Sequence, residues 1–269
     1  MPPLRSVFRI ATWNINSLRL RLPLLERLRD ALNPDVICLQ ETKVPDEAFP
    51  ELAPAALGYG HYVRRGMKSY NGVAIFSRLP LTLHLDWPEW YGKPDCRHLA
   101  VTVATAQPLT VHNFYIPAGG DIADPELNPK FAHKLGFLDE VTAHFAALAP
   151  LTRTLVVGDL NIAPLEHDVW SHKALLNVVS HTPVEVEKHL AWQNTNFIDA
   201  PRALVPHDRK LYSWWSYRNN DWKVSNRGRR LDHVWATPDL KPVSVQTLEE
   251  ARDWPQSSDH VPVCVEFEI

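Results

Sequence analysis

Six segments of the sequence carry polar side chains suited to catalysis, and each lies next to a run of apolar residues. These side chains mix carboxylates, amides, a phenol and an imidazole: Asn14, Glu41, Tyr115, Asp159, Asp232 and the adjacent pair Asp259 and His260. One polar strand end is commonplace, but six separate ones predict a single convergent pocket. Carboxylate and amide oxygens without a cysteine cluster suit a hard cation such as Mg²⁺ or Mn²⁺. His and Asp together suit proton transfer or phosphate binding, so the set is typical of phosphoryl transfer to water.

The segment RTLVVGDLNIAP shows this pattern most clearly. Leu155, Val156, Val157 and Gly158 predict a buried strand and its exit. Asp159 and Asn161 follow two residues apart, a spacing that places both side chains on the same side of a strand. A plain turn is the alternative, because Asp, Asn and Pro are all turn-formers. The segment by itself does not decide between the two interpretations.

Alternating strand-like and helix-like runs must position these side chains. Strands are predicted at residues 8–15, 35–42, 71–78, 99–105, 109–117, 154–161, 230–237 and 261–269. Helices are predicted at residues 22–32 and 128–148, the second with Pro129 near its start. Strands with helices between them indicate α/β layering, and strands that follow one another directly indicate mixed sheets.

Composition bounds the classes of protein that the chain can represent. Its 269 residues are 45% hydrophobic, which is ample for a core, and the formal net charge of −3 excludes a surface coated in positive charge. The three cysteines make no disulfide framework, and Cys38 and Cys264 lie in apolar runs that predict buried thiols and a reducing cytoplasm. We find no signal-peptide pattern and no stretch that approaches a membrane span.

A basic and aromatic stretch covers residues 202–230. It holds eight Lys or Arg against two Asp, interleaved with Tyr212, Trp214, Trp215, Tyr217 and Trp222. Cations for phosphates and flat rings for an unpaired sugar or base are typical of a nucleic-acid groove. The alternative is that LYSWWSY forms a core strand followed by a solvated basic loop.

Taken in order, seven segments resemble the successive motifs of a known family: ATWNINSLR, DVICLQETK, YNGVAIFSR, NFYIP, GDLNIAP, RRLDHVWAT and SSDHVPV. They are similar to the exonuclease III family of abasic-site endonucleases, within the endonuclease/exonuclease/phosphatase superfamily. The resemblance runs from residue 10 to residue 265. It implies an α/β (α+β) fold: a four-layer sandwich of two mixed β-sheets packed face to face and flanked by helices, in one domain over residues 1–269.

The resemblance also implies a role for each site residue. Glu41 matches the principal metal ligand, and Asn14, Asn16 and Asp259 match further metal-side positions. Asn16 is also a candidate for substrate binding. Asp159 matches the residue that orients or deprotonates the attacking water. The remaining catalytic matches contact the phosphate or orient a group that does: Tyr115, Asn161 and the pair Asp232 and His260.

For DNA, the resemblance implies backbone contacts by Lys68, Tyr70 and Asn71, and a pocket for the abasic sugar walled by Trp214 and Trp215. Arg218, Arg229 and Arg230 are the further DNA-binding candidates from the basic stretch. Arg229 departs from relatives that carry an aromatic or aliphatic residue there, which leaves the balance between endonuclease and exonuclease activities open.

The expected function is a Mg²⁺-dependent repair nuclease, with Mn²⁺ as the other candidate ion. It would cleave the phosphodiester 5′ to abasic sites in double-stranded DNA, with 3′–5′ exonuclease and 3′-phosphatase activities on blocked 3′ ends. We expect a cytoplasmic monomer that binds no membrane. One alternative is a phosphatase or phosphodiesterase for an inositol or lipid phosphate, which LQETK and the basic stretch disfavour. A DNA-binding protein without catalysis is a second, which the intact polar set disfavours.

Overall fold

The structure is a computed structural model that describes residues 7–219 and 221–269. Within these residues twelve strands form two six-stranded sheets. The first sheet has the spatial order β11 (Lys241–Thr247), β12 (Val263–Glu268), β1 (Val7–Asn14), β2 (Val36–Gln40), β4 (Val73–Ser77) and β3 (His61–Arg65). The second has the order β5 (Leu81–Leu83), β6 (His98–Val103), β7 (Leu109–Tyr115), β8 (Thr154–Asp159), β10 (Asp232–Ala236) and β9 (Ile198–Asp199). Both sheets are mixed, with the parallel pairs β1–β2 and β7–β8.

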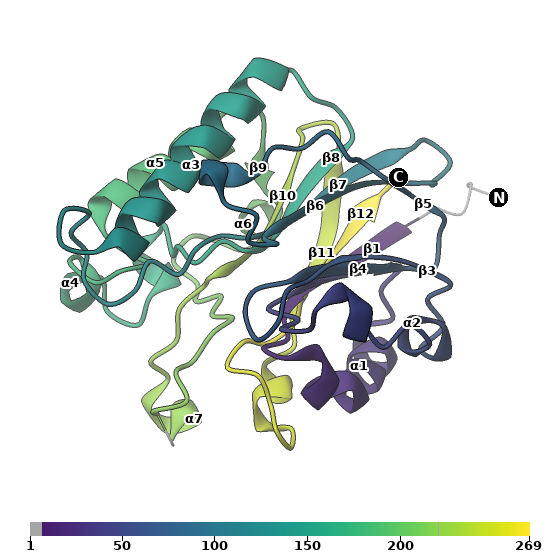
Figure 1. Cartoon of the computed structure of the whole chain (residues 1–269). Helices are drawn as coiled ribbons and strands as arrows, with labels where there is room; N and C mark the ends of the chain where they lie inside the picture. Colours follow the sequence, from purple (N-terminus) through teal and green to yellow (C-terminus); the bar gives the residue numbers. More distant parts are fainter. Residues whose placement is uncertain (1–6, 220) are drawn as a thin grey trace.

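Helices cover the outer faces of the two sheets (Figure 1). On the first sheet lie α1 (Leu18–Leu32) and α2 (Ala53–Ala56), and on the second lie α3 (Pro129–Leu148) and α5 (Pro183–Gln193). Shorter helices lie in the connections: α4 (His172–Leu175), α6 (Ala200–Leu204), α7 (Trp222–Ser225), and the 3₁₀ turns η1 (Asp46–Ala48), η2 (Trp90–Gly92), η3 (Glu166–Asp168) and η4 (Glu249–Asp253). The four-layer sandwich expected from the resemblance is therefore confirmed.

The strands read as unbroken apolar runs because both faces of each sheet are buried. On β8, Leu155 and Val157 pack into the core between the sheets. Val156, one residue between them, points the other way into the layer under α3 and α5. A strand buried on both faces shows no alternation of apolar and polar residues, so its polar end residues are its only distinctive side chains.

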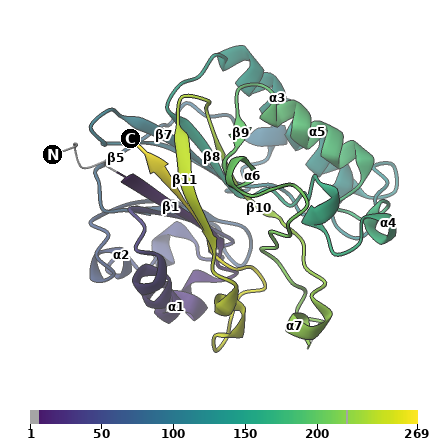
Figure 2. The ribbon, with the colours of Figure 1, turned by 180° about the vertical axis from the view of Figure 1, so that it is seen from behind.

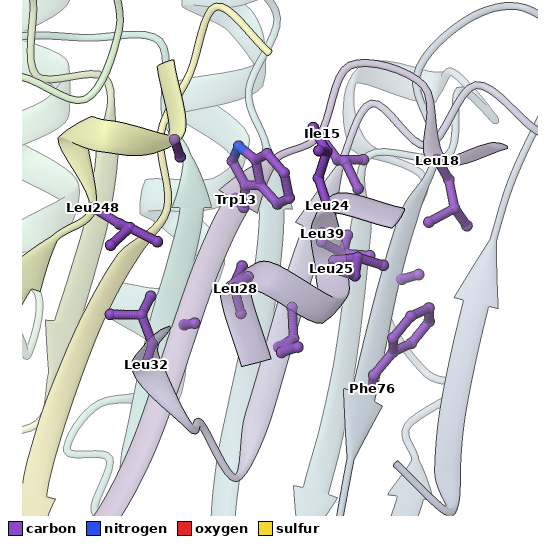
Figure 3. Packing of buried hydrophobic residues seen from close by; sticks show 14 of the residues in the cluster. Trp13, Ile15, Leu18, Leu24, Leu25, Leu28, Leu32, Leu39, Phe76 and Leu248 are labelled. Carbon is purple, nitrogen blue, oxygen red and sulfur yellow. The ribbon is translucent and has the colours of Figure 1, made fainter. Parts of the chain in front are cut away.

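Helix α1 covers the first sheet through one apolar stripe. Leu18, Leu25, Leu28 and Leu32 recur at the helical spacing and are buried. They pack with Trp13 and other side chains of the first sheet in one cluster (Figure 3). This packing holds β1 and β2 in place, and both strands end at the site described below.

All ten predicted elements are present, with small shifts at their ends. The sequence pattern missed β3, β5, β9 and β11, which are short or largely exposed edge strands. In β11, apolar and polar residues alternate too little to predict a strand, and most of its residues are exposed. LYSWWSY is no strand of either sheet, since Trp214 makes only isolated bridges there, but Tyr212 and Trp215 do pack in the core as that alternative expected. No helix among the described residues is long and apolar enough to cross a membrane.

Candidate active site

Strand ends from both sheets bring the predicted polar residues to one edge of the sandwich. β1 ends at Asn14 and its parallel neighbour β2 ends just before Glu41. β7 and β8 likewise end together, with Tyr115 paired to Asp159. Antiparallel β10 starts there, because Asp232 lies opposite Asp159 in the register. The segments that carry α7 and η4 project from this end of the molecule (Figure 2).

Glu41 lies at the centre of the first group of side chains. Its carboxylate accepts hydrogen bonds from Asn14 Nδ2 at 3.0 Å and from the Tyr115 hydroxyl at 2.7 Å, and pairs with Lys43 Nζ at 2.7 Å. Burial acts to raise the pKa of Glu41, but the charge of Lys43 and the donated hydrogen bonds outweigh it and lower the pKa. Glu41 is therefore a carboxylate at neutral pH.

Asn16 and Asp259 form the neighbouring group. Asn16 Nδ2 donates to Asp259 Oδ1 at 3.1 Å, and Trp214 Nε1 donates to Asp259 Oδ2 at 3.0 Å. The ammonium of Lys43 lies 2.6 Å from Asn16 Oδ1 as well as close to Glu41. The position of this ammonium shows that positive charge is favourable beside the side-chain oxygens of Glu41, Asn16 and Asp259. A donor set made only of oxygens fits Mg²⁺ or Mn²⁺.

Asn14 connects the two carboxylates at the centre of the site. It is fully buried, and its Nδ2 donates to Glu41 and to Asp159 Oδ2 at 2.9 Å. Its Oδ1 accepts the backbone N–H of Asn16 at 3.1 Å. With its amide nitrogen between the two carboxylates, Asn14 orients both of them. Its expected role at the metal stays a prediction.

Asp159 and His260 form a buried pair of groups that can exchange protons. His260 Nδ1 lies 2.8 Å from Asp232 Oδ2, and His260 Nε2 lies 3.7 Å from Asp159 Oδ2. Burial alone would lower the pKa of His260, but the carboxylates of Asp232 and Asp159 raise it to about 10. Burial raises the pKa of Asp159 to about 7, against the lowering effect of His260. A carboxyl that titrates near neutral pH is suited to accept a proton from water.

The same three side chains also offer a metal-binding arrangement. One ligand atom from each of Asp159, Asp232 and His260 lies within 4.8 Å of the others. A metal ion bound by all three would have to displace the hydrogen bond between His260 and Asp232 and take the place of a proton. At the oxygen-rich place beside Glu41 and Asp259, an ion would replace contacts of the Lys43 ammonium and leave the hydrogen bond between His260 and Asp232 intact.

Asn161 fixes the orientation of Asp159. Its backbone N–H donates to Asp159 Oδ1 at 3.0 Å and its Nδ2 to Asp159 Oδ2 at 3.2 Å. This double contact depends on a left-handed backbone at Asn161, with φ of 54°. Lys134, fully buried on α3, donates to the Asn161 carbonyl at 2.8 Å and secures the turn from outside.

A cavity of ≈ 530 Å³ opens beside these residues. Glu41, Tyr115, Asp159, Asn161, Asp259 and His260 line its catalytic side. Trp214, Arg218, Arg229 and Leu231 line another part of its wall, with Val178 to Ser180 and residues 118, 120 and 121. Burial, Glu41 and Asp159 raise the pKa of Tyr115 well above its usual range, so its phenol keeps its proton and acts as a donor.

Two of the residues expected to contact DNA lie in the interior instead. The guanidinium of Arg230 is buried, with Nε and Nη2 each 2.9 Å from Asp168 and Nη1 2.8 Å from Asp199. Trp215 is only 1% exposed and donates its indole N–H to Asn226. Both expectations are wrong, because each side chain points away from the cavity into a packed layer.

The other expected DNA contacts lie at the surface or at the cavity and stay predictions. Lys68, Tyr70 and Arg218 are exposed. Asn71 is half-buried, and its Nδ2 donates to the Asp95 carbonyl at 2.8 Å while its own carbonyl accepts the N–H of Lys43. Asn71 therefore supports the turn that carries Glu41 and Lys43.

Sequence reasoning missed several residues that hold the site together. Lys43 follows Glu41 by two residues in a loop, where no periodicity marks it. Ser213 Oγ accepts the backbone N–H groups of Leu231 and Asp232, at 3.1 and 3.0 Å, and so sets the start of β10. Ser258 Oγ donates to the Asn14 carbonyl at 2.7 Å. Lys43 and Ser258 had a local signal, since they stand inside the segments DVICLQETK and SSDHVPV.

Comparisons with known proteins agree with this geometry. The model of the endonuclease/exonuclease/phosphatase family matches residues 11–260. The chain is 31% identical to an exodeoxyribonuclease III of Haemophilus influenzae, over 95% of this chain and 98% of that one. Among solved structures, it is similar to a 3′ phosphatase, NExo, from Neisseria bound to a product DNA hairpin, with a TM-score of 0.89 and 30% identity. An AP endonuclease from Archaeoglobus fulgidus gives a TM-score of 0.88 and 29% identity; both alignments cover 97% of this chain and 100% of the other.

Proposed function

Because the chain belongs to the exonuclease III/AP endonuclease family of the endonuclease/exonuclease/phosphatase superfamily, we propose that it is a Mg²⁺-dependent DNA repair nuclease. Its reaction is hydrolysis of the phosphodiester 5′ to an abasic site, which leaves a 3′-hydroxyl. It also removes nucleotides or phosphate from 3′ ends. The single observation that carries the proposal is the position of Asp159, hydrogen-bonded to Asn14 and Asn161 and 3.7 Å from the His260–Asp232 pair, at a cavity edged by Glu41.

Glu41 and Asp259 are the proposed ligands of the ion, with Asn16 beside them. When bound, Mg²⁺ neutralises charge that develops on the phosphate and on the leaving oxygen. Lys43 holds Glu41 and Asn16 at 2.7 and 2.6 Å, so it keeps both oxygens turned toward this place. Mn²⁺ prefers the same oxygen donors.

Asp159 is the proposed acceptor of the water proton. Asn14 and Asn161 direct its Oδ2 by donating to it at 2.9 and 3.2 Å. Its raised pKa of about 7 matches the proton-transfer task near neutral pH. Water adds to phosphorus, the bond from phosphorus to the 3′-oxygen breaks, and the 3′-oxygen ends as a hydroxyl.

His260 is the proposed donor to a non-bridging phosphate oxygen. Asp232 accepts from Nδ1, which fixes the ring and keeps the imidazole charged. The Tyr115 phenol, at the edge of the same cavity, donates to Glu41 in the absence of substrate at 2.7 Å and offers a second donor to the phosphate. No covalent enzyme intermediate is needed.

Double-stranded DNA with abasic sites or blocked 3′ ends is the proposed partner. Lys68, Tyr70 and Arg218 are exposed, and Arg218 lines the cavity; these three side chains are the proposed contacts with the DNA backbone. We propose further that residues 1–269 act as one domain, since the two sheets share a continuous core. A monomer is the proposed oligomeric state. The buried Cys38 and Cys264 agree with a reducing cytoplasm.

One assay tests the proposed function. A labelled duplex with a single internal abasic analogue is incubated with and without Mg²⁺, beside an inositol phosphate in a parallel reaction. We expect Mg²⁺-dependent incision 5′ to the analogue and no release of phosphate from the inositol substrate. Phosphate release from inositol without incision of DNA would move the protein to the alternative phosphatase function. Binding of the duplex without any cleavage would leave only a DNA-binding role.

A further inference from the structure

The wall of the cavity that faces the catalytic residues carries a charged side chain, Arg229. Its guanidinium lies 5.3 Å from the centre of the Trp214 ring. The two residues are also paired through their backbones, since the N–H of each donates to the carbonyl of the other at 3.0 Å. Trp214 in turn donates its indole N–H to Asp259. Arg229 is thus linked to the metal side of the site by one rigid aromatic residue.

A buried turn holds the arginine in place. Arg229 Nη1 donates to the Val179 carbonyl at 3.0 Å and to Ser180 Oγ at 2.7 Å. Ser180 has a left-handed φ of 86°, and its backbone N–H donates to both carboxylate oxygens of buried Glu185. Glu185 also forms the capping box of α5 with Thr182. The start of α5 therefore presents two acceptors that fix one edge of the guanidinium.

Arg229 makes no ion pair in the part of the chain that the structure describes. The one carboxylate whose charge favours it, Glu185, is already paired with Lys134 at 2.5 Å. Its neighbours differ: Arg230 pairs with Asp168 and Asp199, and Arg202 pairs with Asp168. Both of the guanidinium's hydrogen bonds come from Nη1, and buried Nε has no partner among the described residues. Burial lowers the pKa of Arg229, which reflects the cost of removing this cation from water. An anion supplied by the substrate would offset that cost.

The chemistry of the reaction indicates which anion reaches this wall. Water attacks phosphorus opposite the leaving 3′-oxygen, so the remaining substituent on phosphorus stays bound after cleavage and needs room beside the catalytic residues. In an abasic site this substituent is a neutral sugar. In a 3′-phosphate it is an oxygen that carries a second negative charge above a pKa of about 6. In a 3′-phosphoglycolate it is a two-carbon carboxylate, for which a guanidinium is the best-matched side chain.

We propose that Arg229 is a specificity-determining residue that favours DNA 3′ ends with an anionic blocking group over an internal abasic sugar. The inference rests on the proposed function and deepens it, because it names the preferred substrate of the same site. Hydrolysis releases phosphate or phosphoglycolate and leaves a 3′-hydroxyl, with no further reactant than water. Arg229 acts by contact with the blocking group and takes no part in proton transfer.

The test compares three duplexes that share one sequence: a nick with a 3′-phosphate, a nick with a 3′-phosphoglycolate, and an internal abasic analogue. Arg229→Met keeps the length of the side chain and removes the charge. We expect kcat/KM to fall tenfold or more on both blocked ends, and to stay the same or rise on the abasic duplex. Arg229→Lys keeps the charge but loses the planar fork, so its kcat/KM on the blocked ends should lie between those of the wild type and Arg229→Met. Arg227→Met is the matched control, since it removes an exposed charge two residues away.

A binding measurement without turnover separates this proposal from the proposed function. In EDTA, the wild-type protein should bind the 3′-phosphate nick more tightly than the same nick with a 3′-hydroxyl, and Arg229→Met should abolish the difference. Equal losses on all three duplexes, or an unchanged difference in binding, would overturn the role of Arg229. If the wild type cleaves none of the duplexes in Mg²⁺, the proposed function fails, and the binding difference still decides the role of Arg229.

Discussion

At the scale of single residues, the site depends on backbone conformations that few residue types adopt. Asn16, Glu41 and Asn161 have φ values of 47°, 50° and 54°, in the left-handed region. Such a conformation costs roughly 1–2 kcal/mol for a residue with a side chain, least for Asn. Each of these residues stands one or two residues after the end of a strand, and the left-handed turn directs its side chain back toward the strand edge. Strain of this kind is typical of functional positions.

Glu41 is the residue on which metal affinity should depend most. Glu41→Gln keeps the size of the side chain and removes the charge that a hard cation requires. We expect a large loss of cleavage in ordinary Mg²⁺, partly recovered as the Mg²⁺ concentration is raised in a titration of the initial rate. Glu47→Gln, an exposed carboxylate on η1, is the control. Unchanged cleavage at ordinary Mg²⁺ would show that Glu41 is not the principal ligand.

Asp159 is the residue on which turnover should depend most. Asp159→Asn should lower single-turnover cleavage of the abasic duplex by about a hundredfold or more, the scale of a positioned proton-transfer group. DNA binding, titrated in Ca²⁺, should stay intact or tighten, because a negative charge facing the phosphate is removed. A turn-forming role makes the opposite prediction, since Asn is an equally good turn residue. Near-normal cleavage would therefore return this segment to the turn interpretation.

At the scale of elements, the edge of the sandwich is assembled by close approach of strands and by buried ion pairs between connections. β8 passes so near β7 that a side chain at Gly158 would place its Cβ 1.9 Å from the Phe114 carbonyl oxygen. The segment around η3 is joined to β10 and α6 by Asp168, which pairs with Arg230 and Arg202. Burial acts to raise the pKa of Asp168, but the two arginines outweigh it and lower the pKa to about 2.

Gly158 should tolerate no side chain. Gly158 has φ of 140°, and a methyl group there would force β7 and β8 apart just before Asp159. We expect Gly158→Ala to lower the melting temperature and to reduce cleavage together, since the shift displaces Asp159 from Tyr115. Gly60→Ala is the matched control, because a Cβ at Gly60 meets nothing within 4 Å. A Gly158→Ala protein with wild-type stability would contradict the strand contact.

Arg230 should affect stability rather than DNA binding. Arg230→Gln leaves the carboxylates of Asp168 and Asp199 buried with too few partners, and breaking such a pair costs about 3–5 kcal/mol. Urea denaturation should show this loss, while the slope of log K against log salt for DNA stays as in the wild type. Arg218→Gln, at the exposed rim of the cavity, should behave in the opposite way. A stable Arg230→Gln protein with a flattened salt slope would place Arg230 at the DNA after all.

At the scale of the whole molecule, burial of neutral imidazoles links stability to pH. Burial is the main cause that lowers the pKa of His112 and His233 to about 3, and it lowers that of His98 and His189 well below the usual value. These side chains lie in the layer of rings between the second sheet and its helices. Each stays neutral in the folded chain, whereas in the unfolded chain it binds a proton below a pKa of about 6.5.

The protein should therefore lose stability on mild acidification. A group whose folded pKa is depressed contributes stability that is full above pH 6.5 and falls as the pH drops toward 3, by up to about 1.4 kcal/mol per pH unit for each group. Asp159 and His260 oppose this, because their raised pKa values let the folded chain hold protons that the unfolded chain binds only at lower pH, but they are two groups against four, and His260 adds nothing further below about pH 6.5. Urea denaturation at pH 7.5, 6 and 5 in EDTA checks the trend. Stability that stays constant from pH 7.5 to 5 would contradict it.

The sequence by itself determined the layers of the molecule and the chemistry of its site. Apolar runs of strand length, helical spacing in α1 and α3, and polar residues at strand ends are local patterns that fix which elements form. Asn14, Glu41, Tyr115, Asp159, Asp232 and His260 all lie where these patterns predicted, at one edge of the sandwich. Short edge strands such as β11 escaped prediction because they bury too little apolar surface to show a pattern.

Only the tertiary structure decided which of two adjacent residues faces the cavity. Trp214 and Arg229 lie opposite each other and line it, while Trp215 and Arg230, one residue further along each segment, point into the interior. Successive side chains of an extended chain point to opposite sides, so one residue of each adjacent pair must point into the interior. Because both residues of a pair are of the same type, Trp–Trp or Arg–Arg, the sequence does not indicate which one does. The choice is made by partners far away in sequence: Asp168 and Asp199 for Arg230, and the turn before α5 for Arg229.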